Sequence, residues 1–360
     1  MAKRVKVGSR WVGQGEPPYI IAEIGANHNG DMGLAREMID AAKECGCDAV
    51  KFQLWDRFVG HTESYIQQLS TMQKLGDVDL ANPELGLMTV ADQLEQFQCT
   101  QDEHVVLREY ARKVGIDFAS TTSSEPYLDF LANLDVAFLK IPSMDLNFPD
   151  YVRYAARKNL PIVLSTGMAT WAEIDDCVSA VKPAYIDNLV MLHCVALYPP
   201  PRDNMVHLAK MQTLRTLYDV PVGFSDHTLG FSVALAAIAL GACMIEKHFT
   251  LDKKMPGWDH KVSADPEDMQ IICREGKRVF EAIGSPSPEL SPEEIKKRDH
   301  FRRSIVTTVP IAKGETITAD KIFFKRPGTG IEPNEIKYVL GRVAKHDLPA
   351  DELILWQDLI

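Results

Sequence analysis

The sequence predicts a (β/α)8 barrel of the TIM type followed by a small β-rich domain. Eight short β-rich runs alternate with helical patterns from residue 19 to about residue 285, and a span of about 250 residues is typical of such barrels. Polar residues also gather at the C-terminal end of each run, where barrel enzymes have their active sites. A doubly wound sheet would have fewer strands and a Gly-rich phosphate loop after the first one, and the sequence has no such loop there.

The elements alternate strictly along the chain. The runs have the short, β-rich character of strands, and apolar residues recur at helical spacing between them. The expected strands are 19–25, 48–53, 117–122, 137–143, 161–167, 189–194, 221–227 and 244–250. The expected helices are 32–46, 103–115, 125–134, 148–159, 170–182, 207–218, 231–242 and 265–284.

Two segments fall outside this repeat. Residues 54–102 are too long for a βα connection and contain helical patterns of their own. We interpret them as an elaborated loop and helix at the barrel mouth, since long ordered loops tend to be functional, with a plain spacer as the alternative. Pro and Ser mark a linker at 284–300, and the short β runs and turns of 301–360 predict a compact domain. The barrel domain is therefore expected to occupy residues 1–283.

The composition is typical of soluble globular proteins. Of the 360 residues, 46% are hydrophobic and 25% charged, and no run approaches a membrane span or a secretory signal. The net charge of -11 argues against nonspecific nucleic-acid binding but leaves room for a locally basic site. The seven scattered cysteines predict free thiols, and we expect a cytoplasmic protein.

The polar strand ends predict a metal site. Residues two apart on a strand face the same side, and three pairs of polar residues have this spacing. These pairs are Lys51 with Gln53, Ser225 with His227, and Glu246 with His248. Because the seventh and eighth strands are neighbours, His227 and His248 would meet at the mouth, where two imidazoles near carboxylates suit Mn, Zn or Fe. Two unrelated core histidines are the alternative.

Two lysines predict an anionic substrate. Lys51 and Lys140 lie at strand ends, where a buried ammonium group needs an anion. Structural ion pairs with Glu23 or Asp145 are the alternative. Three serines at neighbouring strand ends would help to surround a phosphate and a carboxylate: Ser143, Ser165 and Ser225. The residues alone therefore indicate a metal-assisted barrel enzyme that acts on a small, phosphorylated substrate.

Nine motifs, in order along nearly the whole chain, resemble the sialic acid synthase family with its C-terminal antifreeze-like (SAF) module. They are IIAEIGANHNGD (20–31), KFQ (51–53), LKIPSMDLNFP (139–149), LSTGM (164–168), LHCVALYP (192–199), GFSDHT (223–228), EKHFTLD (246–252), PGWDH (256–260) and KRPGTG (325–330). The resemblance implies a transferase that condenses phosphoenolpyruvate with an N-acetylmannosamine-type sugar, breaking the C–O bond of phosphoenolpyruvate. The products would be a nine-carbon 2-keto acid and phosphate. It also implies a Mn or Mg cofactor and a domain-swapped homodimer in which each SAF module covers the partner's barrel mouth.

The resemblance also assigns roles to residues. His227 and His248 would hold the metal, and Asp145 would be the carboxylate near the metal and water. The phosphate would contact Lys51, Ser165 and Ser225, and the carboxylate of phosphoenolpyruvate would contact Thr121, Lys140 and Ser143. The sugar would be surrounded by Glu23, Gln53, Tyr198 and Asp259, with Arg326 reaching its N-acetyl group from the partner chain, and Glu246 would also be a substrate-binding residue. Of these, Glu23, Asp145, His227, His248 and Asp259 form the expected catalytic set.

This chain departs from the family pattern close to the substrates. Pro142 and Met144 stand where many members have glycine, Asp145 replaces a common glutamate, and Ala196 replaces a polar residue. The sugar therefore stays open between N-acetylmannosamine, its 6-phosphate, and the diacetamido trideoxyhexoses that lead to legionaminic or pseudaminic acid. The rival functions are a synthase of eight-carbon keto sugar acids, an amidohydrolase-like barrel, and a non-catalytic sugar- or ice-binding protein.

Overall fold

The computed structural model describes residues 3–55, 61–71, 74–75, 78–79, 89–285, 287 and 289–360. Contacts divide the chain into two compact units, Met1–Gly284 and Ser285–Ile360. Each unit has a hydrophobic core of its own. Among the helices described, none combines the length and apolar character needed to cross a membrane.

The first unit is a closed barrel of eight parallel strands, as the sequence predicts. Each strand pairs with the next along the chain, and β12 closes the barrel on β3, where His248 lies opposite Glu23. The strands are β3 (Tyr19–Gly25), β4 (Ala49–Gln53), β7 (Asp117–Thr121), β8 (Leu139–Ile141), β9 (Ile162–Ser165), β10 (Leu189–Cys194), β11 (Val222–Asp226) and β12 (Met244–His248). The predicted strands are therefore confirmed to within a few residues at their ends.

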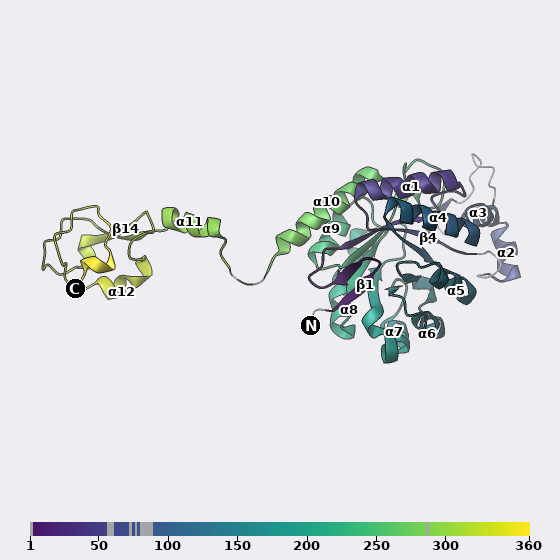
Figure 1. Cartoon of the computed structure of the whole chain (residues 1–360), viewed down its shortest axis with the longest axis horizontal. Coiled ribbons are helices and arrows are strands. Elements are labelled where there is room, and N and C mark those ends of the chain that lie inside the picture. Colours follow the sequence, from purple (N-terminus) through teal and green to yellow (C-terminus); the bar gives the residue numbers. More distant parts are fainter. Residues whose placement is uncertain are drawn as a thin grey trace. The chain divides into compact units, whose positions relative to one another are not determined.

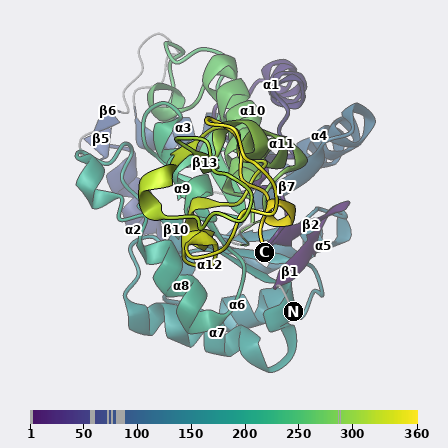
Figure 2. The same cartoon turned by 90° about the vertical axis from the view of Figure 1, so that its left-hand side faces the viewer.

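Each barrel strand is followed by a helix, and Figures 1 and 2 show these helices packed around the strands. Their bounds follow local capping signals; in the first helix, for example, the Asp31 side chain accepts from two backbone N–H groups and Gly46 ends the helix at φ +91. The helices are α1 (Met32–Cys45), α4 (Gln101–Val114), α5 (Glu125–Asn133), α6 (Pro149–Ala156), α7 (Trp171–Tyr185), α8 (Lys210–Tyr218), α9 (Ser232–Ala239) and α10 (Pro266–Ile283).

A hairpin that the sequence analysis did not predict closes the N-terminal end of the barrel. Strands β1 (Arg4–Val7) and β2 (Arg10–Gly13) pair antiparallel. Their apolar residues Val5, Val7 and Val12 are buried against residues at the beginnings of the barrel strands, including Tyr19 and Met244. This plug leaves the C-terminal ends of the strands as the place for a cavity.

The long segment after β4 contains the predicted helical structure in its described part. It forms α2 (Glu63–Leu69), the short antiparallel pair β5 (Lys74–Leu75) and β6 (Val78–Asp79), and α3 (Val90–Gln96). The rest of the predicted 54–102 elaboration, at 56–60, 72–73, 76–77 and 80–88, lies outside the described residues. A capping box between Thr89 and Asp92 fixes the beginning of α3.

The second unit is small and built around its own apolar cluster, which includes Ile305, Ile317 and Ile354. Its regular strands are one antiparallel pair, supplemented by isolated bridges. Its elements are α11 (Pro292–Phe301), β13 (Ser304–Thr307), β14 (Ile322–Lys325) and α12 (Ile336–Val339). Helix α11, part of which falls in the range predicted to be a linker, groups with this unit.

Candidate active site

A cavity of about 570 Å³ lies at the C-terminal ends of the barrel strands. It brings together all but two of the residues that the sequence analysis assigned to the site. These are Glu23, Lys51, Gln53, Thr121, Lys140, Ser143, Asp145, Ser165, Tyr198, Ser225, His227, Glu246 and His248. Asp259 lies beside the cavity, with its Oδ2 3.6 Å from His248 Nδ1, whereas Arg326 belongs to the other unit.

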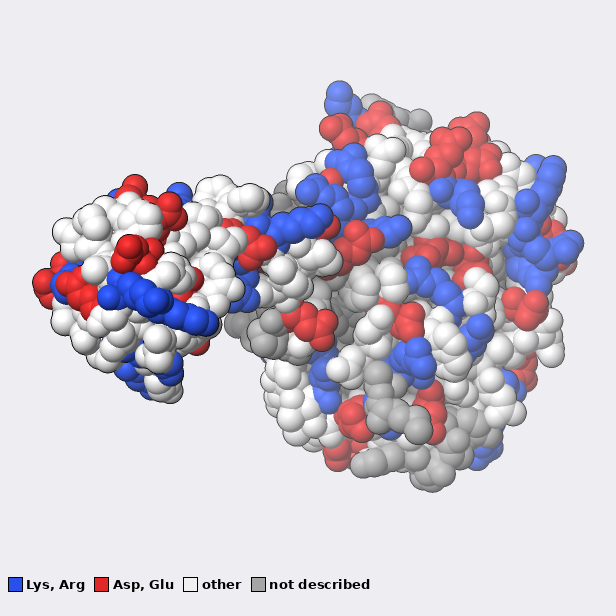
Figure 3. All heavy atoms as spheres, turned by 60° about the vertical axis from the view of Figure 1, so that its left-hand side comes forward, with Lys and Arg blue, Asp and Glu red and all other residues white. Residues whose placement is uncertain are grey.

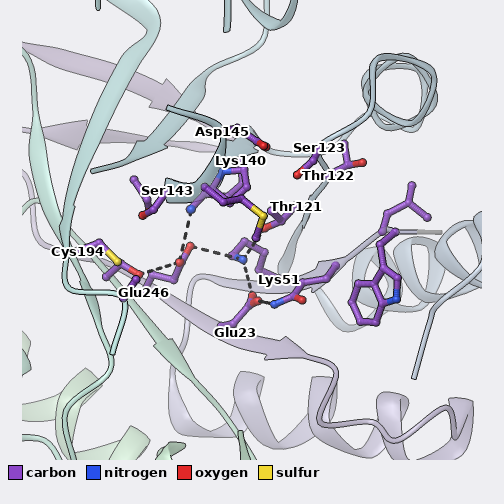
Figure 4. Close-up of a pocket in the computed structure, with 18 of the residues that line it drawn as sticks. Glu23, Lys51, Thr121, Thr122, Ser123, Lys140, Ser143, Asp145, Cys194 and Glu246 are labelled. Atoms are coloured by element: carbon purple, nitrogen blue, oxygen red, sulfur yellow. Dashed lines mark hydrogen bonds and ion pairs between the residues drawn. The ribbon is translucent and has the colours of Figure 1, made fainter. Parts of the chain in front are cut away.

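Two buried lysines and two buried glutamates meet on the floor of the cavity (Figure 4). Lys51 Nζ lies 2.7 Å from Glu23 Oε2 and 3.7 Å from Glu246 Oε2, and Lys140 Nζ lies 3.8 Å from Glu246 Oε1. The alternative of a Lys51–Glu23 ion pair is thus present in the structure, and Glu246 is a second partner that the sequence did not reveal. No ion pair joins Asp145 to either lysine among the described residues.

The surroundings of the two glutamates drive their pKa values apart. Burial raises the pKa of Glu23 to about 7, although Lys51 opposes the shift. Burial would also raise the pKa of Glu246, but Lys140, Lys51 and the Ser225 hydroxyl outweigh it and lower that pKa to about 2. Near neutral pH, two ammonium groups therefore face one ionised carboxylate and one that is partly protonated. This balance suits an anionic ligand.

A backbone irregularity positions Glu23. The register between β3 and β4 shifts between Glu23 and Gly25, and Gly25 adopts φ +53. A side chain there would meet Gln53 Nε2 at 3.1 Å and Glu23 Oε1 at 3.2 Å, the two atoms that share a 2.8 Å hydrogen bond. Glycine is therefore required for the backbone to turn while Gln53 holds the carboxylate.

His227 and His248 lie together, as the strand order predicts. Their ring centroids are 5.4 Å apart, and Tyr198 packs on His227 with centroids 4.0 Å apart. Burial is the main reason that the pKa of His227 falls to about 4 and that of His248 to about 3, so both imidazoles are neutral near pH 7. A neutral imidazole is the form that coordinates a metal.

The donor set fits a divalent metal ion with an open coordination sphere. His227 Nδ1 lies 3.0 Å from the Val195 carbonyl oxygen, which can only accept, so the proton is on Nδ1 and Nε2 keeps its lone pair. His248 Nδ1 is buried and has no hydrogen-bond partner in the described part of the chain. No three His, Cys, Asp or Glu side chains form a metal site there, so water or substrate would complete the coordination.

Hydroxyl groups line the rest of the floor. Thr121 Oγ1 accepts from Lys51 Nζ at 2.7 Å, and Ser225 Oγ donates to Glu246 at 3.0 Å. Ser143 Oγ accepts from the backbone N–H of Gly167 at 2.9 Å. Ser165 Oγ is buried without a partner among the described residues. A polar ligand in the cavity would satisfy this group.

Several lining residues were not predicted as site residues. Cys194 ends β10 beside the polar floor, and nothing in a lone buried cysteine distinguishes it from a core residue. The others come from loops and from helices α3 and α5: Leu54, Trp55, His61, Leu94, Thr122, Ser123, Ser124, Tyr127, Met168 and Trp258. Trp258 lies inside the motif PGWDH, which was the one signal available for it.

Sequence comparisons identify the family of this chain. A model of the NeuB family matches residues 38–287, and a model of the SAF domain matches residues 302–360. The chain is 39% identical over 345 residues to the N,N'-diacetyllegionaminic acid synthase of Legionella pneumophila, which covers 95% of this chain and 94% of that protein. It is 33% identical over 350 residues to the N-acetylneuraminate-9-phosphate synthase of Homo sapiens, with 96% and 94% covered.

Solved structures show the same likeness. The N-acetylneuraminic acid (sialic acid) synthetase from Leptospira borgpetersenii, in complex with citrate, superposes with a TM-score of 0.70 at 31% identity. The match covers 84% of this chain and 98% of that one.

Proposed function

Because this chain belongs to the NeuB family of sialic acid synthases, we propose that it condenses phosphoenolpyruvate with an N-acetylmannosamine-type sugar. The products would be a nine-carbon 2-keto acid and inorganic phosphate. The observation that carries this proposal is the pair of buried lysines converging on Glu246 beside two neutral histidines. The lysines supply charge for an anion, and the histidines supply lone pairs for a cation.

The floor of the cavity would hold phosphoenolpyruvate. Lys51, with Ser165 and Ser225, would bind the phosphate, and Lys140, with Thr121 and Ser143, would bind the carboxylate. Ammonium groups already held in place by Glu23 and Glu246 need little reorganisation to receive the anion, which is the condition for electrostatic catalysis.

The sugar would bind on the histidine side of the cavity. His227 and His248 would hold a divalent ion, Mn or Mg, which when bound acts as a Lewis acid toward the aldehyde oxygen of the open-chain sugar. Glu23, Gln53, Tyr198 and Asp259 would orient the sugar chain. C3 of phosphoenolpyruvate then attacks the aldehyde carbon, and the aldehyde oxygen takes up a proton.

The remaining steps occur at C2 of phosphoenolpyruvate. Attack leaves C2 with oxocarbenium character, which the ionised Glu246 would stabilise. A water molecule adds to C2 and gives up one proton. The new C2 hydroxyl group then loses its proton as the bond from C2 to the phosphate oxygen breaks, which leaves the C2 ketone and free phosphate. Burial raises the pKa of Asp145 above its ordinary value, and the residue lines the cavity, so it is suited to exchange protons with this water.

We also propose that the enzyme is a homodimer in which the SAF unit of one chain covers the barrel mouth of the other. The rim of the mouth exposes large apolar side chains on four consecutive βα loops and at the first residue of α7, and clustered exposed apolar side chains are typical of a protein interface. They are Met144, Phe148, Met168, Trp171, Leu197 and Leu229. Arg326 is exposed on the loop after β14, where it lies over the Phe301 ring, and would be presented to the partner's sugar.

The proposal is tested by measuring phosphate release from phosphoenolpyruvate with and without Mn. The sugars to supply are N-acetylmannosamine, its 6-phosphate, and the 2,4-diacetamido-2,4,6-trideoxyhexoses. We expect release that requires both one of these sugars and the metal, together with a nine-carbon keto acid identified by mass spectrometry. Folded protein that releases no phosphate with any sugar would refute the proposed reaction.

A further inference from the structure

One side of the cavity is aromatic, in contrast to its charged floor. Trp55 and Trp258 stack with ring centroids 6.2 Å apart and planes at 27°, and both line the cavity together with Leu94. Phe97 is buried behind them, edge-on to Trp258 at 5.4 Å. We call Trp55, Leu94 and Trp258 the aromatic wall. Its members come from two segments far apart in the sequence.

Residues of helix α3 accept hydrogen bonds from the indole N–H groups of this wall. Trp258 Nε1 donates to the buried Gln93 side chain, and Trp55 Nε1 donates to the Leu94 carbonyl oxygen at 3.3 Å. The loop that carries Trp258 is fixed in turn, because Asn29 donates to the Pro256 carbonyl oxygen at 2.9 Å. Since both indole N–H groups are already bonded within the protein, the wall offers the cavity ring carbons and a leucine side chain.

The wall lies on the side of the cavity assigned to the sugar. Trp258 precedes Asp259, whose carboxylate is beside His248, and Trp55 follows Gln53 by two residues, beyond the end of β4. If the proposed function holds, the aldehyde end of the sugar lies at the two histidines. The rest of the sugar chain would then extend outward along the wall toward the mouth.

We propose, on the basis of the proposed function, that the aromatic wall selects a sugar whose far end is apolar. The class of substrate is a 2,4-diacetamido-2,4,6-trideoxyhexose, with a methyl group at C6 and an N-acetyl methyl at C4. These methyl groups would pack on the indole faces, whereas the hydroxyl or phosphate groups of N-acetylmannosamine and its 6-phosphate would lose hydration there without gaining hydrogen bonds from the side chains of Trp55, Leu94 or Trp258. Contacts with the wall would therefore set the ratio of kcat/KM between these sugars.

The experiment compares kcat/KM for three sugars in wild-type enzyme and in Trp258→Gln and Trp55→Gln variants. The sugars are a 2,4-diacetamido-2,4,6-trideoxymannose, N-acetylmannosamine and N-acetylmannosamine 6-phosphate. We expect the wild type to prefer the trideoxy sugar by about tenfold or more, the range for one group in an apolar pocket. Each variant should lower this ratio toward one while leaving KM for phosphoenolpyruvate unchanged.

Because the ratio is measured within each protein, a general loss of activity in one variant cancels, and the second Trp variant covers a failure of the first to fold. Trp11→Leu is the matched control: Trp11 is half-exposed in the β1–β2 hairpin, and its replacement should leave the ratio unchanged. Equal or better use of N-acetylmannosamine or its phosphate would overturn the inference while the proposed function stands. A ratio that neither Gln variant changes would also overturn it. Absence of turnover with every sugar would instead refute the proposed function itself, and the inference with it.

Discussion

At the scale of single residues, burial sets the chemistry of the candidate site. The same desolvation that keeps His227 and His248 neutral raises the pKa of Glu23 and of Asp145. Glu246, in contrast, has a lowered pKa, because two ammonium groups and a hydroxyl face it. Neighbouring groups of the same kind thus acquire different roles from their surroundings.

Replacement of His248 by Ala tests the metal assignment. We expect the variant to lose metal-dependent turnover, and its affinity for Mn, measured by calorimetry, to fall by at least about 100-fold because a ligand is lost. Far-UV circular dichroism should stay unchanged, since the side chain makes no structural hydrogen bond in the described part of the chain. His207→Asn, at an exposed histidine with φ +50, is the control and should bind Mn normally. Full activity of His248→Ala in metal-free buffer would refute the assignment.

His104, a buried histidine outside the cavity lining, predicts acid sensitivity. His104 Nδ1 lies 2.9 Å from the Thr100 carbonyl oxygen and its Nε2 lies 2.9 Å from Ser120 Oγ, in a pocket that Phe52 and Phe118 complete. Burial lowers the pKa of His104 from 6.5 to about 4. The unfolded chain therefore takes up this proton at a higher pH than the folded protein does.

This difference in pKa decides in which direction the folding stability changes with pH. The stability that His104 contributes is fully present above about pH 6.5 and is lost as the pH falls toward 4, by roughly 3 kcal/mol for a shift of this size. Urea unfolding of wild type and His104→Gln at several pH values measures it. We expect the variant to show a shallower decline between pH 6.5 and 4. If the unfolding free energies of wild type and variant declined in parallel with pH, the assignment of a neutral buried imidazole would be contradicted.

At the scale of elements, an ion pair clamps β11 to β12 on the side of the strands away from the cavity. Lys247 Nζ lies 2.7 Å from Asp226 Oδ2 and 2.7 Å from the Thr228 carbonyl oxygen, and both charged side chains are fully buried. Asp226 also accepts from the backbone and side chain of Thr228. The clamp immediately flanks both His227 and His248, so it fixes the spacing of the two imidazoles.

Replacement of Lys247 by Met should be strongly destabilising, because it leaves the Asp226 carboxylate buried without its partner. We expect a loss of about 3–5 kcal/mol in the free energy of unfolding, measured by urea denaturation. The comparison is Lys158→Met, which removes a partly exposed ion pair with Asp129 and should cost at most about 1 kcal/mol. Similar losses for the two variants would show that the buried ion pair contributes no more to stability than the partly exposed one.

At the scale of the whole molecule, the charge needed to bind an anion lies inside the cavity and not on the surface face that Figure 3 draws. On the face drawn in Figure 3, basic and acidic side chains are interspersed and no extended area is of one sign. The whole chain carries a net charge of -11, while the lysines that matter for an anion are buried in the cavity. Binding of an anionic small molecule needs only this local charge.

Subunit complementation tests the proposed dimer. Arg326→Ala removes the arginine that one chain would present to its partner, and His248→Ala inactivates the barrel of its own chain. In a mixed dimer, the intact barrel would be completed by the intact arginine of the other chain. Co-refolding the two inactive variants in equal amounts should restore about a quarter of the wild-type activity, since half of the dimers are mixed and each has one complete site. No recovery, with mixed dimers demonstrated by mass, would exclude a shared site.

The sequence by itself determined the barrel and most of its polar floor. Alternation along a strand has a period of two, so residues such as Lys51 and Gln53, or Glu246 and His248, necessarily face one side. Strand order then places the ends of β11 and β12 together, which is why the histidine pair was predictable. The β1–β2 hairpin was not predicted, since two four-residue strands carry too little pattern to identify.

Only the tertiary structure decided what the sequence left open. The pairing of both lysines with Glu246 depends on side chains that reach across the barrel from three strands. The aromatic wall depends on α3 bonding to both tryptophans, one of them 165 residues away from its partner Gln93. Local pattern fixes which way a side chain points from its own strand. It carries no information on which distant side chain is met there, because that contact arises only when the barrel closes.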